Sequence, residues 1–99
     1  MIFLDVKYFN WNNEKNIILK KSRGIGFEDI LFYIEKGFIL DDYTHPNKKQ
    51  YPNQRIMVIG IENYAYLIPY IETKNELFLK TIIPSRKATE IYFGENHER

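Results

Sequence analysis

The fold is decided by the stretch QRIMVIGIENYAYLIPYIETKNELFLKTIIPSRKAT, which runs from Gln54 to Thr89. It contains three runs rich in β-branched, aliphatic and aromatic residues, a composition typical of strands: Gln54 to Glu62, Tyr64 to Glu72 and Glu76 to Ile83. The breaks between these runs are only a few residues long. Because short connections join antiparallel neighbours, we predict three consecutive antiparallel strands.

Both faces of this predicted sheet are largely apolar. In the first run, Met57 and Ile59 share a face with Arg55, while Ile56 and Val58 point the other way. Helices should therefore cover one face, and the other face needs a second cover: another helix, a partner chain or a ligand.

A proline interrupts the middle run. Pro69 has no N–H to donate to a sheet, so we expect a bulge or lost pairing near the end of this strand. Tyr70, Lys80 and Arg86 can then gather around the irregular corner. The structural alternative is that each is an ordinary surface residue, since a lysine at a strand end usually extends its charge into solvent.

The rest of the chain adds helices on either side of the strands. Periodicity and capping residues predict, in order, a strand over Ile2 to Phe9, a helix from Asn12 to about Ser22, a helix from Phe27 to Gly37, a short strand over Phe38 to Asp42 and a last helix from Arg86 to about Gly94, with Ser85 as its N-cap. The predicted class is α+β: a single domain spanning residues 1–99, with a mainly antiparallel sheet, two N-terminal helices on one face and a short C-terminal helix.

Composition excludes several classes of site. The 99 residues include no cysteine, which excludes disulfides, thiolate metal ligands and cysteine nucleophiles. His45 and His97 lack metal-ligand spacing, so we expect neither a metal nor a cofactor. The net charge of +1 does not mark a nucleic-acid binder by itself. We expect a cytoplasmic protein, because no basic leader and no apolar run of membrane-spanning length is present.

What remains is a set of cations and tyrosines: Arg55, Lys80, Arg86, Lys87, Tyr70 and Tyr92. Such groups can bind phosphate and offset a developing negative charge, and tyrosine or lysine can move protons when neighbours shift their pKa. Asp41 and Asp42, beside His45, can form an acid/base cluster, but adjacent carboxylates at a strand end are more often solvated turn residues. We favour the solvated alternative.

Two signatures carry a family resemblance. The first is Phe9-Asn10-Trp11-Asn12-Asn13-Glu14-Lys15-Asn16 followed by Arg23-Gly24-Ile25-Gly26-Phe27-Glu28-Asp29, and the second is Ser85-Arg86-Lys87-Ala88-Thr89 after a strand. Over roughly Tyr8 to Tyr92 the chain resembles the BrnT family of bacterial type II toxins. Arg23 stands where that family often has a histidine, and Lys80 lies one position before the family's basic residue.

The resemblance implies a RelE-like ribonuclease fold, RNA cleavage that blocks translation, and neutralisation by a BrnA-like ribbon-helix-helix antitoxin. It implies either a homodimer or a toxin–antitoxin heterotetramer, with DNA bound only through the antitoxin. In this chemistry the ribose 2′-hydroxyl attacks the adjacent phosphate without a metal. Arg55 and Arg86 would hold the phosphate, and Lys80 or Tyr70 would assist proton removal. Lys87, Tyr92 and Arg23 would contact RNA, with Tyr92 stacking on a base.

A second hypothesis uses the same fold without catalysis. In that case the chain is an interaction module whose apolar sheet face binds a partner helix, and the cations pair with acidic residues such as Glu72, Glu76 and Glu90. Arg86 would then be a helix-start residue paired with Glu90, four positions later.

Overall fold

The computed structural model describes residues 7–97 and shows an α+β domain. Within that range three helices accompany a mixed sheet. Along the chain the elements are β1 (Tyr8–Asn10), α1 (Asn13–Arg23), α2 (Phe27–Glu35), β2 (Ile39–Thr44), β3 (Gln54–Ile61), β4 (Tyr64–Glu72), β5 (Glu76–Leu79), β6 (Ile83–Pro84) and α3 (Arg86–His97). Of the predicted first strand, residues 2–6 lie outside the described range.

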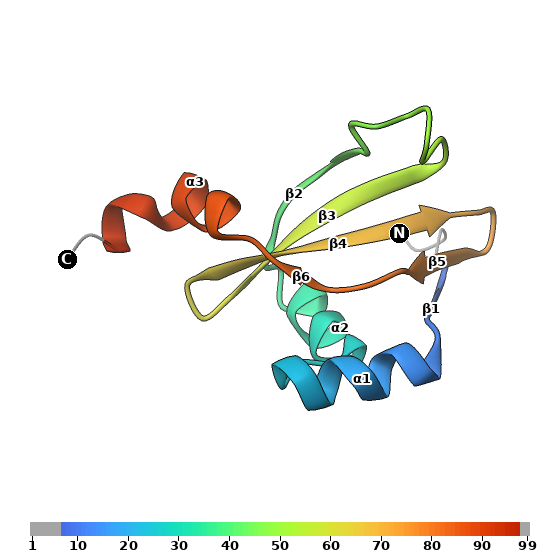
Figure 1. Cartoon of the computed structure of the whole chain (residues 1–99), viewed down its shortest axis with the longest axis horizontal. Helices are drawn as coiled ribbons and strands as arrows, with labels where there is room; N and C mark the ends of the chain where they lie inside the picture. Colours follow the sequence, from blue (N-terminus) through green and yellow to red (C-terminus); the bar gives the residue numbers. More distant parts are fainter. Residues whose placement is uncertain (1–6, 98–99) are drawn as a thin grey trace.

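The sheet has the strand order β1-β5-β4-β3-β2, and β6 pairs separately with β4. β3 and β4 form a long antiparallel hairpin whose turn residues, Glu62 and Asn63, both have positive φ. This left-handed pair matches the twist of the two strands. β1 alone is parallel to its neighbour, β5. Figure 1 shows β3 and β4 crossing the molecule, with α1 and α2 below them and α3 at one end.

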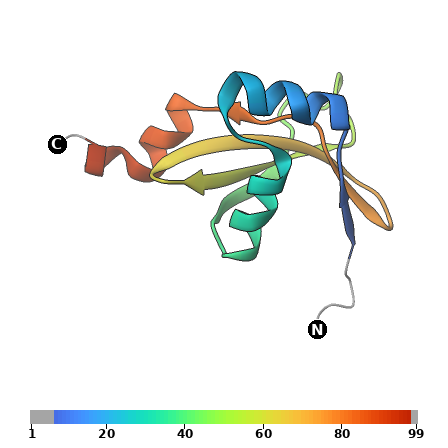
Figure 2. The ribbon, with the colours of Figure 1, turned by 90° about the horizontal axis from the view of Figure 1, so that it is seen from below.

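The two N-terminal helices begin and end where the sequence predicts. The side chain of Asn12 caps α1 by accepting a hydrogen bond from the Lys15 amide, and Gly24 ends this helix in the left-handed conformation at φ 75°. Gly37, at φ 88°, follows the end of α2. Glycine adopts these angles without the steric penalty that a Cβ brings. In Figure 2 both helices lie in front of the strands, and α3 stands clear of them at the other end.

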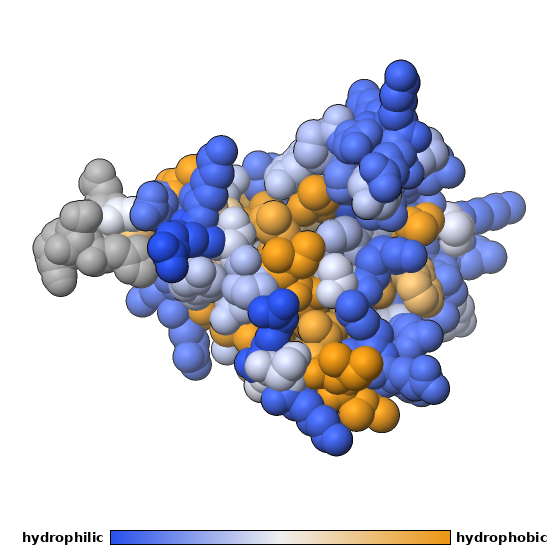
Figure 3. Space-filling view, in the orientation of Figure 1, coloured by the Kyte–Doolittle hydropathy of each residue, from blue (hydrophilic) through white to orange (hydrophobic). Residues whose placement is uncertain are grey.

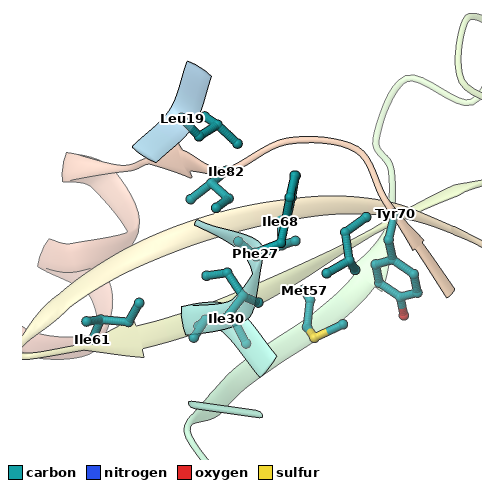
Figure 4. Close-up of a cluster of buried hydrophobic side chains, with 10 residues drawn as sticks. Leu19, Phe27, Ile30, Met57, Ile61, Ile68, Tyr70 and Ile82 are labelled. Atoms are coloured by element: carbon teal, nitrogen blue, oxygen red, sulfur yellow. The ribbon is translucent and has the colours of Figure 1, made fainter. Parts of the chain in front are cut away.

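The main core lies between these helices and one face of the sheet. Phe27 and Ile30 of α2 are fully buried, as are Ile59 and Ile68 on the two central strands. Figure 4 shows the cluster extending from Ile61 at one end to Tyr70 at the other. The alternation of side chains along β3 and β4 places all of these strand residues on the same face.

A buried polar contact holds α1 against the start of α2. The Asn16 side chain accepts a hydrogen bond from the Phe27 amide at 2.7 Å and donates to both carboxylate oxygens of Glu28 at 3.0 and 3.1 Å. The pKa of Glu28 is lowered, chiefly by this hydrogen bond from Asn16. Gly26 leaves no room for a Cβ, which would lie 2.8 Å from Asn16 Oδ1. Trp11 stacks on Phe27 at 5.4 Å. The first family-like signature thus forms a structural junction.

The opposite face of the sheet carries a smaller core under α3. Ala88 of this helix packs with Val58 and Ala65. The hydroxyl of Ser85 accepts from the Ala88 amide at 3.0 Å, which confirms the predicted N-cap. The buried Thr89 accepts from the Ala65 amide at 2.8 Å and donates to the Ser85 carbonyl. The second family-like signature therefore docks the last helix onto β4.

The predicted length of the third strand is wrong. The sequence predicts one strand from Glu76 to Ile83, but β5 ends at Leu79 and β6 begins at Ile83. The break lies opposite Pro69, whose carbonyl accepts from the Lys80 amide at 2.8 Å. The Pro69 nitrogen points to this same side of β4 and has no hydrogen to donate. β4 itself stays paired with β3 through this position, so the disruption falls on the partner strand.

Candidate functional site

Three polar side chains meet at one end of the helix-covered face: Asp42, Arg55 and Tyr70. The Arg55 Nε donates to Asp42 Oδ1 and to the Tyr70 hydroxyl, both at 3.2 Å. The Tyr70 hydroxyl donates to the Asp42 carboxylate, 2.8 Å from each oxygen. The Arg55 Nη2 lies 3.2 Å from Asp42 Oδ1 and completes an ion pair. We call this group the Arg55 cluster.

Strand register brings the cluster together. Arg55 of β3 pairs directly with Tyr70 of β4 on one side and with Thr44 of β2 on the other. Asp42 is two residues before Thr44 and therefore shares its face. Three strands thus supply one side chain each to the same corner, and the Thr44 hydroxyl lies 3.5 Å from Arg55 Nη1.

Burial is graded across the cluster. Tyr70 is 2% exposed and ends the main core, whereas the Arg55 and Asp42 side chains are each 38% exposed. Burial, followed by the hydrogen bond to Asp42, raises the pKa of Tyr70 to about 12. The hydrogen bond with Tyr70, followed by the charge of Asp42, raises the pKa of Arg55. At neutral pH the cluster therefore contains a fixed cation and a protonated phenol, a proton donor rather than a base.

Asp42 is the candidate site residue that sequence reasoning missed. We predicted Asp41 and Asp42 to be solvated turn residues, but both lie within β2 and both make side-chain contacts. His45 does not join them, because its Nδ1 accepts from the Asn47 amide and its ring packs on Tyr51. A usable signal existed: a charged residue on an apolar strand, such as Arg55, needs a counter-charge on a neighbouring strand.

Asp41 points to the other face and contacts α3. The Tyr92 hydroxyl donates to Asp41 Oδ2 at 2.9 Å. Burial, followed by this hydrogen bond, raises the pKa of Tyr92, and burial followed by the charge of Asp41 raises that of Tyr43. Tyr92 is 37% exposed, which leaves it accessible for stacking.

The structure does not bring the predicted cations to one site. Lys80 is exposed, with its Nζ 5.8 Å from the centre of the Phe78 ring, on the face away from Tyr70. Arg86 and Lys87 are exposed at the start of α3, and Arg86 is two residues after Pro84, which pairs with Tyr66. Tyr66 is four residues from Tyr70 along β4, about 13 Å at the rise of a strand. Only Arg55 and Tyr70, of the predicted catalytic residues, are in contact.

Glu72 and Glu76 have other partners than the cations of the predicted site. Glu72 pairs with Lys7, and Glu76 accepts from the Asn10 side chain. Among the side chains of residues 7–94, neither Arg86 nor Lys87 forms an ion pair. The structure therefore lacks the Arg86–Glu90 pair of the sequence alternative.

Arg23 lies in the last turn of α1, beside a pocket at the far end of the helix-covered face. The pocket has a volume of about 340 Å³ and is lined by Gly24, Ile25, Asp29, Tyr33, Ile61, Glu62, Tyr64 and Tyr66. The charge of Arg23 acts on Tyr66, opposing the rise in its pKa that burial causes. Arg23 is thus separated from the Arg55 cluster by the length of the core.

No group of histidine and carboxylate side chains suited to a metal ion occurs in the described part of the chain. None of the helices between residues 7 and 97 has the length and apolarity needed to cross a membrane. Comparisons with protein-family models, curated proteins and solved structures returned no match for this chain.

Proposed function

We propose that this chain is a RelE-like endoribonuclease of the BrnT toxin type, which cleaves RNA without a metal and so blocks translation. The observation that carries the proposal is the contact between Arg55 and Tyr70 in the Arg55 cluster. An arginine can bind a phosphodiester in two places at once, and a protonated phenol beside it can donate a proton.

The proposed reaction uses the ribose 2′-hydroxyl as nucleophile. The 2′-oxygen attacks phosphorus, the bond to the 5′-oxygen breaks, and a 2′,3′-cyclic phosphate forms. Arg55 holds the phosphate and offsets the charge that builds on its oxygens. Tyr70, with its raised pKa of about 12, donates its proton to the departing 5′-oxygen. Asp42, 2.8 Å from Tyr70, accepts the proton of the 2′-hydroxyl.

These roles revise the expectations drawn from the sequence. Tyr70 becomes the proton donor, and Lys80, on the opposite face, is left out of the reacting centre. Arg86 and Lys87 become contacts to RNA phosphates away from the scissile bond, with Tyr92 on the same helix as the base-stacking residue. Arg23 extends the RNA contacts along the far end of the helix-covered face.

We propose a BrnA-like ribbon-helix-helix antitoxin as partner, with DNA bound only through it. Large apolar side chains remain exposed in the described structure: Ile17, Ile18, Phe32, Phe38, Ile83 and Ile91. Figure 3 shows apolar atoms crossing the middle of one face beside the more hydrophilic surface of α3. Exposed apolar surface of this kind is suited to burial against a partner chain, either in a toxin–antitoxin heterotetramer or in a homodimer.

The test is cleavage of RNA by the purified chain in the presence of a chelator. The expected product carries a 2′,3′-cyclic phosphate, and Arg55→Ala should slow its formation by about 10²–10³ while the protein stays folded. Induced expression should stop growth, and co-expression of the antitoxin should restore it. Cleavage that requires an added metal, or equal cleavage by Arg55→Ala, would refute the mechanism.

One observation favours a non-catalytic interaction module. The guanidinium of Arg55 is already paired with Asp42, so the resting site offers no free cation. Under this alternative the wild-type chain neither cleaves RNA nor arrests growth, yet it still binds its partner. A pull-down with the partner, run beside the RNA assay on the same preparation, separates the two functions.

A further inference from the structure

We infer that the Arg55 cluster is an anion-binding site. In the structure the carboxylate of Asp42 occupies the position that a bound phosphate group would take. The ligand class is a phosphate ester or another phosphate anion. The inference rests on the proposed function in taking phosphate as the natural ligand, but it concerns binding and requires no cleavage.

The first argument is the set of donors that converge on one carboxylate. Asp42 Oδ1 alone receives Nε and Nη2 of Arg55 and the hydroxyl of Tyr70, at 3.2, 3.2 and 2.8 Å. A guanidinium edge with a hydroxyl beside it is also a common way to hold a phosphate oxygen. The donors are therefore positioned to bind an anion, and in the structure that anion is the Asp42 carboxylate.

The second argument is that Asp42 occupies the Nε–Nη2 edge of the Arg55 guanidinium. The Arg55 Nε and Nη2 are used by Asp42 and Tyr70, its Nη1 faces the Thr44 hydroxyl at 3.5 Å, and its Nη2 also approaches the Asp42 carbonyl at 3.4 Å. A phosphate that takes both bonds of this edge must displace the Asp42 carboxylate. The core does not block this, since both side chains are 38% exposed.

The third argument is the position of Asp42 in the sheet. β2 is the outermost strand beyond β3, and its register with β3 is irregular between Ile39 and Asp41. An edge strand with an irregularity is held by one neighbour only, so Asp42 can move with less loss of pairing than Arg55 or Tyr70, which lie on β3 and β4. Arg55 and Tyr70 can therefore stay in place while the Asp42 carboxylate moves out of the site.

The neighbouring carboxylate provides a matched control. Asp41 lies on the opposite face, bonded to Tyr92, and its replacement by asparagine changes the net charge of the chain by the same amount. Any difference between Asp41→Asn and Asp42→Asn in anion binding therefore reports position rather than total charge.

The experiment is isothermal titration calorimetry with inorganic pyrophosphate on the full chain. We expect Asp42→Asn to bind about fivefold more tightly than wild type, the factor that corresponds to losing a competing ion pair of ~1 kcal/mol. Asp41→Asn should bind as wild type does. Adding Arg55→Gln to Asp42→Asn should remove the gain.

A second variant guards against loss of folding. Asp42→Ser keeps a small polar side chain at the edge strand and should show the same gain, with the folded state of each variant checked by thermal unfolding. In wild type, pyrophosphate should shift the NMR signal of the Arg55 Nε–H. The inference is overturned if folded Asp42→Asn and Asp42→Ser bind no more tightly than Asp41→Asn, or if Arg55→Gln leaves the gain intact.

These outcomes are separable from those of the proposed function. If wild type cleaves no RNA but Asp42→Asn gains pyrophosphate affinity, the anion site stands and the ribonuclease does not. If wild type cleaves RNA and Asp42→Asn shows no gain, the reaction stands and the resident-anion role of Asp42 is wrong. Where both hold, Asp42→Asn should lower both KM and kcat, because the competing anion and the proton acceptor are the same group.

Discussion

Asp41 and Asp42 are adjacent in the sequence and belong to different halves of the molecule. Asp42 joins the Arg55 cluster on the face covered by α1 and α2, while Asp41 bonds Tyr92 on the face covered by α3. Side chains alternate along the strands between these two faces, and the alternation separates the main core from the smaller one. The comparison shows that one residue of register decides whether a carboxylate meets an arginine or a tyrosine, and with it the chemistry available.

The largest expected difference between the faces is in stability. Phe27 is 0% exposed in the main core, whereas Phe93 of α3 is only partly buried in the smaller core. We expect Phe27→Ala to lower the free energy of unfolding by about 3–5 kcal/mol, and Phe93→Ala to lower it by less. Urea denaturation of both variants measures this. Equal losses would show that α3 contributes as much to the core as α2 does.

The two arginines should differ in their effect on cleavage. We expect Arg55→Ala to lower kcat by about 10²–10³, since it removes a donor to the developing charge. Arg86→Ala should leave kcat nearly unchanged and raise KM in a salt-dependent way, as expected for a distant phosphate contact. Single-turnover RNA cleavage at two salt concentrations distinguishes them. Loss of kcat in Arg86→Ala would restore the site predicted from the sequence.

The adjacent carboxylates should differ in their contribution to folding. Asp42→Ala leaves the hydroxyl of Tyr70, a residue only 2% exposed, without its acceptor, which costs about 1–3 kcal/mol. Asp41→Ala removes a bond to an exposed tyrosine and should cost less than about 0.5 kcal/mol. Chemical denaturation at neutral pH gives both values. The reverse order would mean that the docking of α3 depends on Asp41.

The smallest expected effect appears only at alkaline pH. Because the pKa of Tyr70 rises to about 12 on folding, the unfolded chain releases this proton first, near pH 10. The contribution of Tyr70 is therefore complete below pH 10 and is lost as the pH rises from 10 to 12. Tyr70→Phe should show a smaller fall in stability over this range, measured by urea unfolding. Tyr92→Phe serves as the comparison on the other face, and an unchanged fall in Tyr70→Phe would contradict the assignment.

Local signals in the sequence were sufficient for the helices and the central hairpin. Asn12, Gly24 and Ser85 cap helices as their residue types predict, and β4 has the predicted bounds. These features depend on interactions within a few residues of each other, which a sequence displays directly. Local signals name Arg55 and Tyr70 as site candidates but do not predict their contact, because the two residues lie on different strands.

Which candidate residues come into contact depends on the register of the strands. The register of three strands placed Asp42 beside Arg55, and the register of β4 with β5 set Leu79, rather than Lys80, opposite Tyr70. Neither follows from composition or periodicity, because a register is set by the packing of whole strands against helices and a shift of one residue reverses every side chain. Composition and periodicity predicted most of the elements and the apolar character of both sheet faces. The pairing of the strands brought Asp42, Arg55 and Tyr70 together.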